Sequence, residues 1–107
     1  MSTLERAIEI AMKAHKGQMD KAGAPYILHP LRVMMSLDSE SEMIVGILHD
    51  VIEDSAWTAE QLREEGFSEE IIEALDCLTK REGESYEDFI DRAKLTPLSH
   101  RVKIADL

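Results

Sequence analysis

The sequence predicts an all-α fold of about six to seven helices. Serine and threonine recur at positions typical of helix N-caps, often with Glu or Gln three residues later. Behind these caps, apolar residues recur at intervals of three and four, the spacing of one helix face. No segment alternates apolar and polar residues clearly enough to indicate a strand.

The first helix is expected to begin at Ser2-Thr3-Leu4-Glu5, which has the form of a capping box. Gly17 should end it, because glycine is favoured just past a helix C-terminus. Residues 16–25 hold two glycines and a proline and therefore predict a loop. The inner face of this helix is predicted to carry Leu4, Ala7, Ile8, Ala11 and Met12.

Two further helices are predicted between the loop and residue 54. One should start between Pro25 and Pro30 and end near Asp38. The next begins at a second capping box, formed by Ser39 and Glu42. The residues expected to face inward are Leu31, Met34, Met35 and Leu37 in the first of these, and Met43, Ile44, Ile47, Leu48 and Val51 in the second.

The second half of the chain repeats the pattern of cap, apolar face and breaker. A short helix is expected from Thr58 to Gly66, and Ser68 and Ser85 should cap the two helices that follow it. Pro97 precedes the opening turns of a last one. The inward residues are predicted to be Ile71, Ile72, Leu75, Leu78, Phe89, Ile90, Ala93, Leu98, Val102 and Ala105.

Composition limits the classes of partner. The chain has 107 residues and a net charge of −10, which argues against binding a nucleic-acid polymer or an anionic membrane surface. The single cysteine, Cys77, cannot form an intrachain disulfide, as is usual in a reducing compartment. No apolar run approaches the length of a membrane span, and no secretory leader is evident. We therefore expect a cytoplasmic, soluble domain and leave open whether it forms a homo-oligomer.

Candidate chemistry is concentrated at the end of the third predicted helix. His49 and Asp50 are adjacent there, and Glu53 and Asp54 lie three and four residues after Asp50, on its face of the helix. Carboxylates crowded beside a histidine are costly without a cation. An acidic helix end is more often a solvated surface, but this one is set among Leu48, Val51 and Ile52, and His29 also lies among apolar residues.

Four segments together resemble the HD-domain superfamily of metal-dependent phosphohydrolases, and most closely the RelA/SpoT-type hydrolase domains and small alarmone hydrolases that cleave (p)ppGpp. The segments run in the order of that family, from residue 15 to the last residue. They are His15-Lys16-Gly17-Gln18, Gly23-Ala24-Pro25-Tyr26-Ile27-Leu28-His29-Pro30, Leu48-His49-Asp50-Val51-Ile52-Glu53-Asp54 and Val102-Lys103-Ile104-Ala105-Asp106-Leu107.

The resemblance implies a single HD-domain helical bundle over residues 1–107, and it implies roles for individual residues. The implied metal ligands are His29, His49, Asp50 and Asp106. Mn²⁺ is the ion that this family usually binds, although the donor set alone does not distinguish it from Fe²⁺, Zn²⁺ or Ni²⁺. Glu53 and Asp54 correspond to the pair that activates water and transfers its proton.

The substrate should be a small nucleotide or phosphate ester. Three cations are candidates to bind its phosphates: Arg32, one turn after His29, and Lys21 and Lys103, which lie close to the matched segments. His15 is expected to be a buried structural histidine and His100 a surface residue.

Two departures from the family bear on the substrate. Where alarmone hydrolases have Arg-Lys-Ser, this chain has Asp20-Lys21-Ala22, so it lacks the family's guanine-stacking arginine and nucleotide-binding serine. The sequence also stops at Leu107, before the asparagine with which the family contacts the nucleotide, and we expect a C-terminal truncation. The leading hypothesis is a hydrolase of (p)ppGpp that cleaves its 3′-pyrophosphate. The alternatives are an HD hydrolase of another nucleotide or phosphodiester, and a non-catalytic, metal-binding regulatory HD module.

Overall fold

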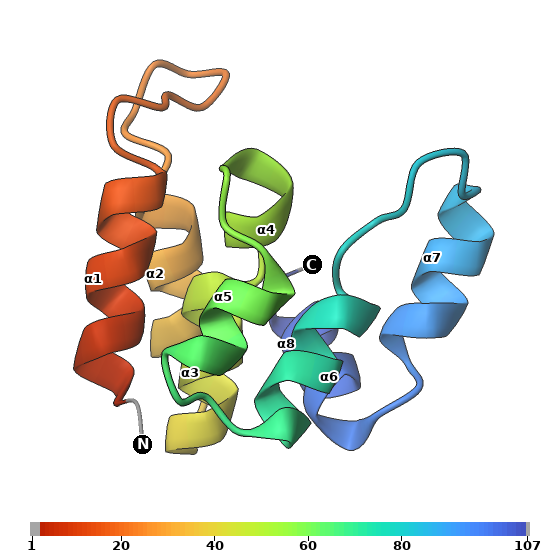
Figure 1. The fold of residues 1–107 in the computed structure, drawn as a ribbon. Helices are drawn as coiled ribbons and strands as arrows, with labels where there is room; N and C mark the ends of the chain where they lie inside the picture. The colour runs from red at the N-terminus through yellow and green to blue at the C-terminus, as the bar shows by residue number, and fades with distance from the viewer. Residues whose placement is uncertain (1–2, 107) are drawn as a thin grey trace.

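The computed structural model describes residues 3–106, and these residues form an all-α bundle, as predicted (Figure 1). Within this range the only β pairing is an isolated bridge between Met19 and Pro25. The helices are α1 (Leu4–Ala14), α2 (Leu28–Met35), α3 (Glu40–Leu48), α4 (Val51–Asp54), α5 (Ala59–Glu64), α6 (Glu69–Cys77), α7 (Tyr86–Ala93) and α8 (Pro97–Asp106).

The predicted helix starts are confirmed at four of the N-caps. Ser39 and Thr58 form complete capping boxes at α3 and α5, and the Ser68 and Ser85 hydroxyls accept hydrogen bonds from backbone N–H groups in α6 and α7. At α1 the N-cap is Thr3, whose hydroxyl accepts from the Arg6 N–H, whereas Ser2 lies outside the described residues.

Helix α3 is the centre of the core. Its apolar residues are buried against α1 and α2 on one side and α6 and α8 on the other. Two inward predictions are wrong: Met12 is 57% exposed and Met35 is 75% exposed. In α1 the buried face is centred on Ala7, Ile10 and Ala11, so Met12 falls outside it. Met35 is the last residue of α2 and points past the packed face.

The third predicted helix is divided in two at the site residues, contrary to the expectation that it would run on through Val51. His49 is the C-cap of α3 and Asp50 is the N-cap of α4. The Asp50 backbone, at φ −100° and ψ −3°, departs from regular α-helical angles. This division brings the number of helices in residues 3–106 to eight, one or two more than predicted.

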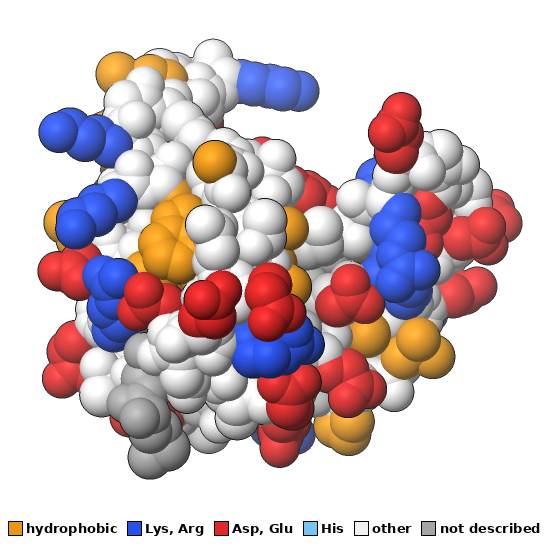
Figure 2. Space-filling view, in the orientation of Figure 1, with side chains coloured by type: hydrophobic (Ala, Val, Ile, Leu, Met, Phe, Trp, Pro, Cys, Tyr) orange, Lys and Arg blue, Asp and Glu red, His pale blue; other side chains and the backbone are white. Residues whose placement is uncertain are grey.

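Acidic residues are frequent on α5, α6 and α7. Figure 2 shows acidic side chains gathered over α5, α6 and α7, with fewer lysines and arginines among them. Helix α7 lies at the edge of the bundle (Figure 1), where Arg92 forms an ion pair with Glu84 at 2.7 Å and donates to the carbonyl oxygen of Thr79. Among residues 3–106, none of the helices combines the length and apolar character needed to cross a membrane.

Candidate metal centre

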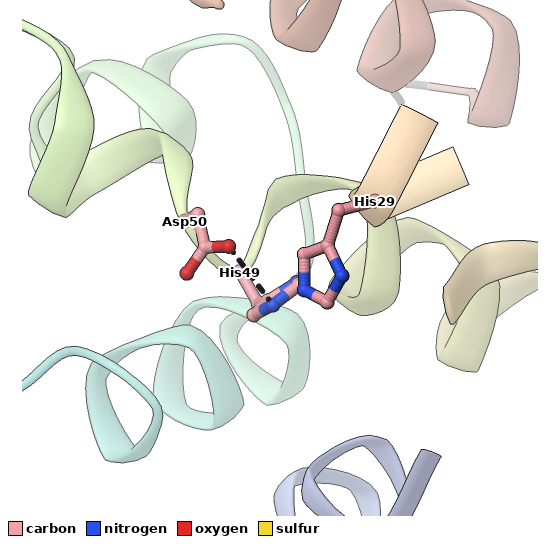
Figure 3. Close-up of side chains that lie close together, drawn as sticks. All are labelled: His29, His49 and Asp50. Atoms are coloured by element: carbon pink, nitrogen blue, oxygen red, sulfur yellow. Dashed lines mark ion pairs between the residues drawn. The ribbon is translucent and has the colours of Figure 1, made fainter. Parts of the chain in front are cut away.

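Residues far apart in the sequence meet where α2, the α3–α4 junction and the end of α8 converge. The Nε2 atom of His29 lies 2.8 Å from Oδ1 of Asp106. The Nε2 atom of His49 lies 3.2 Å from Oδ2 of Asp50 and 3.3 Å from Oδ1 of Asp106. One donor atom each from His29, His49 and Asp50 fall within 4.8 Å of one another, and Figure 3 shows these three side chains facing a common point.

The hydrogen bonds of His49 leave one of its nitrogens available as a metal donor. Its Nδ1 lies 2.6 Å from the carbonyl oxygen of Gly46, which can only accept, so Nδ1 carries the proton. Its Nε2 is buried and has no aligned hydrogen-bond partner among the described residues. An imidazole oriented through one nitrogen, with the other directed at carboxylates, is the usual arrangement of a metal-binding histidine. The donor set, two imidazoles and two carboxylates, fits a divalent ion.

The electrostatics of the cluster also favour a cation. Burial lowers the pKa of His49, but Asp106 and Asp50 more than offset this and raise it to about 10. The nearby His49 imidazole holds the pKa of Asp106 far below its usual range, and the same imidazole lowers the pKa of Asp50 despite its burial. A positive charge at this point, either a proton or a metal ion, therefore compensates the two carboxylates.

Tyr26 supports the site and was not singled out by the sequence. Its hydroxyl donates to Oδ2 of Asp50 at 2.5 Å. Burial, followed by this bond to Asp50, raises the pKa of Tyr26 well above its usual range, so the hydroxyl keeps its proton. A tyrosine one turn before His29 in an apolar segment was a usable signal, because a half-buried hydroxyl needs a partner.

The two carboxylates expected to handle protons, those of Asp54 and Glu53, have different surroundings. Partial burial and the charge of Asp50 raise the pKa of Asp54, which is four residues after Asp50 at the end of α4. Glu53 is exposed, and its Oε1 accepts a hydrogen bond from the Lys80 backbone N–H, in the loop after α6. Glu53 thereby connects α4 to the α6–α7 loop.

Of the three candidate phosphate-binding cations, the structure brings one to the cluster. The Nζ of Lys103 lies 3.5 Å from Oδ2 of Asp106 and 5.2 Å from the centre of the Phe89 ring. Arg32 and Lys21 are exposed, and neither has a side-chain hydrogen bond or ion pair within residues 3–106. His15 is buried, as predicted, and His100 is exposed.

Asp20 has a structural function in its loop. Its Oδ1 accepts hydrogen bonds from the backbone N–H groups of Ala22 and Ala24, both at 2.9 Å. The carboxylate therefore closes the turn that leads into the Gly23–Pro30 segment. Asp20, which occupies the position of the family's arginine, thus stabilises the loop. Ala22, at the position of the family's serine, is exposed.

The chain is similar in sequence to proteins named for guanine-nucleotide metabolism. The chain is 45% identical over 66% of its length to a guanosine-3′,5′-bis(diphosphate) 3′-pyrophosphohydrolase of Haemophilus influenzae. It is 32% identical over 99% of its length to a probable GTP pyrophosphokinase of Mycobacterium leprae. The chain spans 11% and 15% of these two relatives, respectively. No protein-family model matches it.

A solved structure has the same fold. It is described as a metazoan ortholog of SpoT that hydrolyzes ppGpp, and it superposes with a TM-score of 0.82 over 99% of this chain and 66% of the other. The identity is 20%, so this match concerns the arrangement of the helices.

Proposed function

Because this chain is an HD domain of the RelA/SpoT type, we propose that it is a metal-dependent phosphohydrolase of nucleotides such as (p)ppGpp. The observation that carries the proposal is the convergence of His29, His49, Asp50 and Asp106. Two imidazoles and two carboxylates that come together from separate helices lower the stability of the fold unless an ion binds them.

The four ligands would hold one divalent ion, and we propose Mn²⁺. Fe²⁺, Zn²⁺ and Ni²⁺ accept the same donors, so the choice of Mn²⁺ rests on the resemblance to alarmone hydrolases. When bound, such an ion lowers the pKa of a water molecule and polarises a phosphoryl oxygen. Tyr26 fixes the orientation of Asp50 through its hydroxyl, and the Gly46 carbonyl fixes that of His49.

The protein's own acid–base group would be Asp54. Its pKa is raised by burial and by the neighbouring Asp50 carboxylate, so it accepts a proton more readily than an ordinary aspartate. It would take the proton of the attacking water and return it to the leaving group. Glu53 would act beside it with Oε2, because Oε1 is engaged by the Lys80 N–H.

The substrate would be bound chiefly by cations at the rim of the site. Lys103 is already beside Asp106, and Arg32 and Lys21 would approach the phosphates from α2 and from the loop. Two of the relatives are named for guanine nucleotides, and we propose the same substrate class here. Asp20 and Ala22 supply neither the stacking cation nor the hydroxyl of the family, so guanine binding should be weak.

One observation favours a second function, a non-catalytic, metal-binding regulatory module. The Glu53 carboxylate is tied to the α6–α7 loop, which gives it a structural role independent of catalysis. Such a module would bind the metal and a nucleotide without turnover.

The test is turnover by the purified chain with Mn²⁺ and a panel of ppGpp, GTP and a simple phosphodiester. We expect Mn²⁺-dependent hydrolysis of at least one nucleotide, with Asp54→Asn at least ~100-fold slower. Nucleotide binding without hydrolysis, by protein that carries the metal, would refute the hydrolase and establish the regulatory module.

A further inference from the structure

The buried histidine at the end of α1 belongs to a side-chain network that reaches the site. His15 is 2% exposed, and its Nδ1 lies 3.0 Å from Oε1 of Gln18. The amide nitrogen of Gln18 donates to two carbonyl oxygens, which fixes the orientation of the amide. Its Oε1 must therefore accept, so the proton of His15 is on Nδ1.

One of those two carbonyl oxygens belongs to Asp54. The Gln18 Nε2 donates to the Asp54 carbonyl at 3.1 Å and to the Ala14 carbonyl at 3.2 Å. Gln18 thus connects the last turn of α1 to the last residue of α4. Its own carbonyl oxygen accepts from the Tyr26 N–H at 2.8 Å, so the same residue also positions the tyrosine that holds Asp50.

Helix α4 depends on such external contacts. It has four residues and no side-chain N-cap, and a helix this short is unstable alone. The Ser55 hydroxyl donates to the Val51 carbonyl. The other side-chain hydrogen bonds of α4 within residues 3–106 join Gln18 to the Asp54 carbonyl and Glu53 to the Lys80 N–H. These two bonds connect α4 to one segment that precedes it in the sequence and one that follows it.

Core packing alone does not account for a histidine at position 15. With the proton on Nδ1, the buried Nε2 is an acceptor, and it has no partner among the described residues. A buried polar atom without a partner destabilises the fold, so an apolar side chain would pack there at lower cost. The centre of the His15 ring lies 5.0 Å from that of the Tyr26 ring, so the two rings are in contact.

We propose that His15 and Gln18 are positioning residues, which hold α4, the helix that carries Asp54 and begins at the metal ligand Asp50, in place beside the metal centre. The expected effect on the rate rests on the proposed hydrolase function. The expected effect on the stability of α4 does not. His15 acts through Gln18, and neither residue needs to touch metal or substrate. A displacement of about 1 Å in a proton-transferring group can lower the rate about 100-fold.

The test compares Gln18→Leu with Gln61→Leu. Gln61 is the matched control, because its side chain also bonds to backbone, at Thr58 N–H in the α5 capping box. The kinetic readouts are kcat and KM for ppGpp with Mn²⁺, and the binding readout is bound Mn²⁺ per chain. The structural readout is hydrogen exchange of the Asp54 amide, which donates to the Asp50 carbonyl at 3.0 Å.

We expect Gln18→Leu to bind Mn²⁺ normally and to lower kcat at least ~10-fold with KM little changed. Its Asp54 amide should exchange at least ~10-fold faster than in Gln61→Leu, at a similar unfolding temperature. His15→Leu should behave like Gln18→Leu, whereas His15→Asn should recover much of kcat, because an asparagine amide can donate from the position of Nδ1.

Equal exchange of the Asp54 amide in Gln18→Leu and Gln61→Leu would overturn the inference, whether or not the chain is active. Loss of Mn²⁺ from Gln18→Leu would also overturn it, because the residue would then serve the metal site as a whole. If the wild-type chain hydrolyses none of the nucleotides, the proposed function fails, and the exchange measurement still decides the role of Gln18.

Discussion

Replacing Tyr26 with phenylalanine removes a single hydroxyl behind the metal centre. That hydroxyl donates to Oδ2 of Asp50 at 2.5 Å, a bond to a charged group that contributes about 1.5–3 kcal/mol when buried. The ring and its contacts with His15 and His29 remain, so the fold should persist. The Asp50 carboxylate, however, becomes free to rotate, and it must be ordered again when the ion binds.

Loss of such an outer contact typically weakens metal binding 10- to 100-fold, which corresponds to about 1.4–2.8 kcal/mol. We expect this change in the Mn²⁺ dissociation constant of Tyr26→Phe, measured by calorimetric titration. Tyr86→Phe is the control, because Tyr86 is the other tyrosine and is 63% exposed. An Mn²⁺ affinity of Tyr26→Phe equal to that of Tyr86→Phe would refute the reasoning.

Three further predictions concern catalysis, substrate and pH. Glu53→Gln and Asp54→Asn should keep the metal and lose at least ~100-fold in hydrolysis rate; loss of metal by either variant, with its fold intact, would make that residue a ligand. The unmodified chain should hydrolyse ppGpp poorly, and efficient ppGpp turnover by it would contradict this prediction. Asp20→Arg should raise the affinity for ppGpp, although it removes the two hydrogen bonds that the Asp20 carboxylate accepts in its loop. Ala22→Ser is the companion variant, because it leaves those two bonds in place. Without metal, the pKa of His49 is raised to about 10, so below that pH a proton competes with the ion for the imidazole. The affinity for Mn²⁺ should therefore rise about tenfold per pH unit between about pH 6.5 and 8.5. An affinity that does not change with pH would exclude proton displacement from His49.

The helix starts could be predicted from the sequence because caps are local. Ser39 with Glu42 and Thr58 with Gln61 needed no tertiary information, since each pair bonds within its own first turn. The convergence of His29, His49 and Asp50 was expected from the family resemblance, and the structure brings them together. Their roles in binding and catalysis remain predictions.

Features that depend on tertiary contacts could not be predicted in the same way. The division between α3 and α4 at His49 and Asp50 lies where apolar residues continue at helical spacing through Val51, so the sequence pattern did not indicate it. The Glu53 contact with the Lys80 N–H joins residues 27 positions apart, and the Gln18 contact with Asp54 joins residues 36 apart. Asp20 differs from the family residue at its position, but its function in closing the loop is visible only in the backbone geometry.

The central claim is that one divalent ion is bound by four residues, His29, His49, Asp50 and Asp106. The most direct test is a titration with Mn²⁺ in which electron paramagnetic resonance measures the free and bound ion. The wild-type chain should bind about one ion, and His49→Ala should bind none at the same concentrations. His29→Ala provides a second test, because the His29 side chain is 36% exposed and its removal should leave the fold intact, and His100→Ala is the exposed-histidine control. Both ligand variants should lose the ion while His100→Ala keeps it; full Mn²⁺ binding by folded His49→Ala and His29→Ala would contradict the assignment.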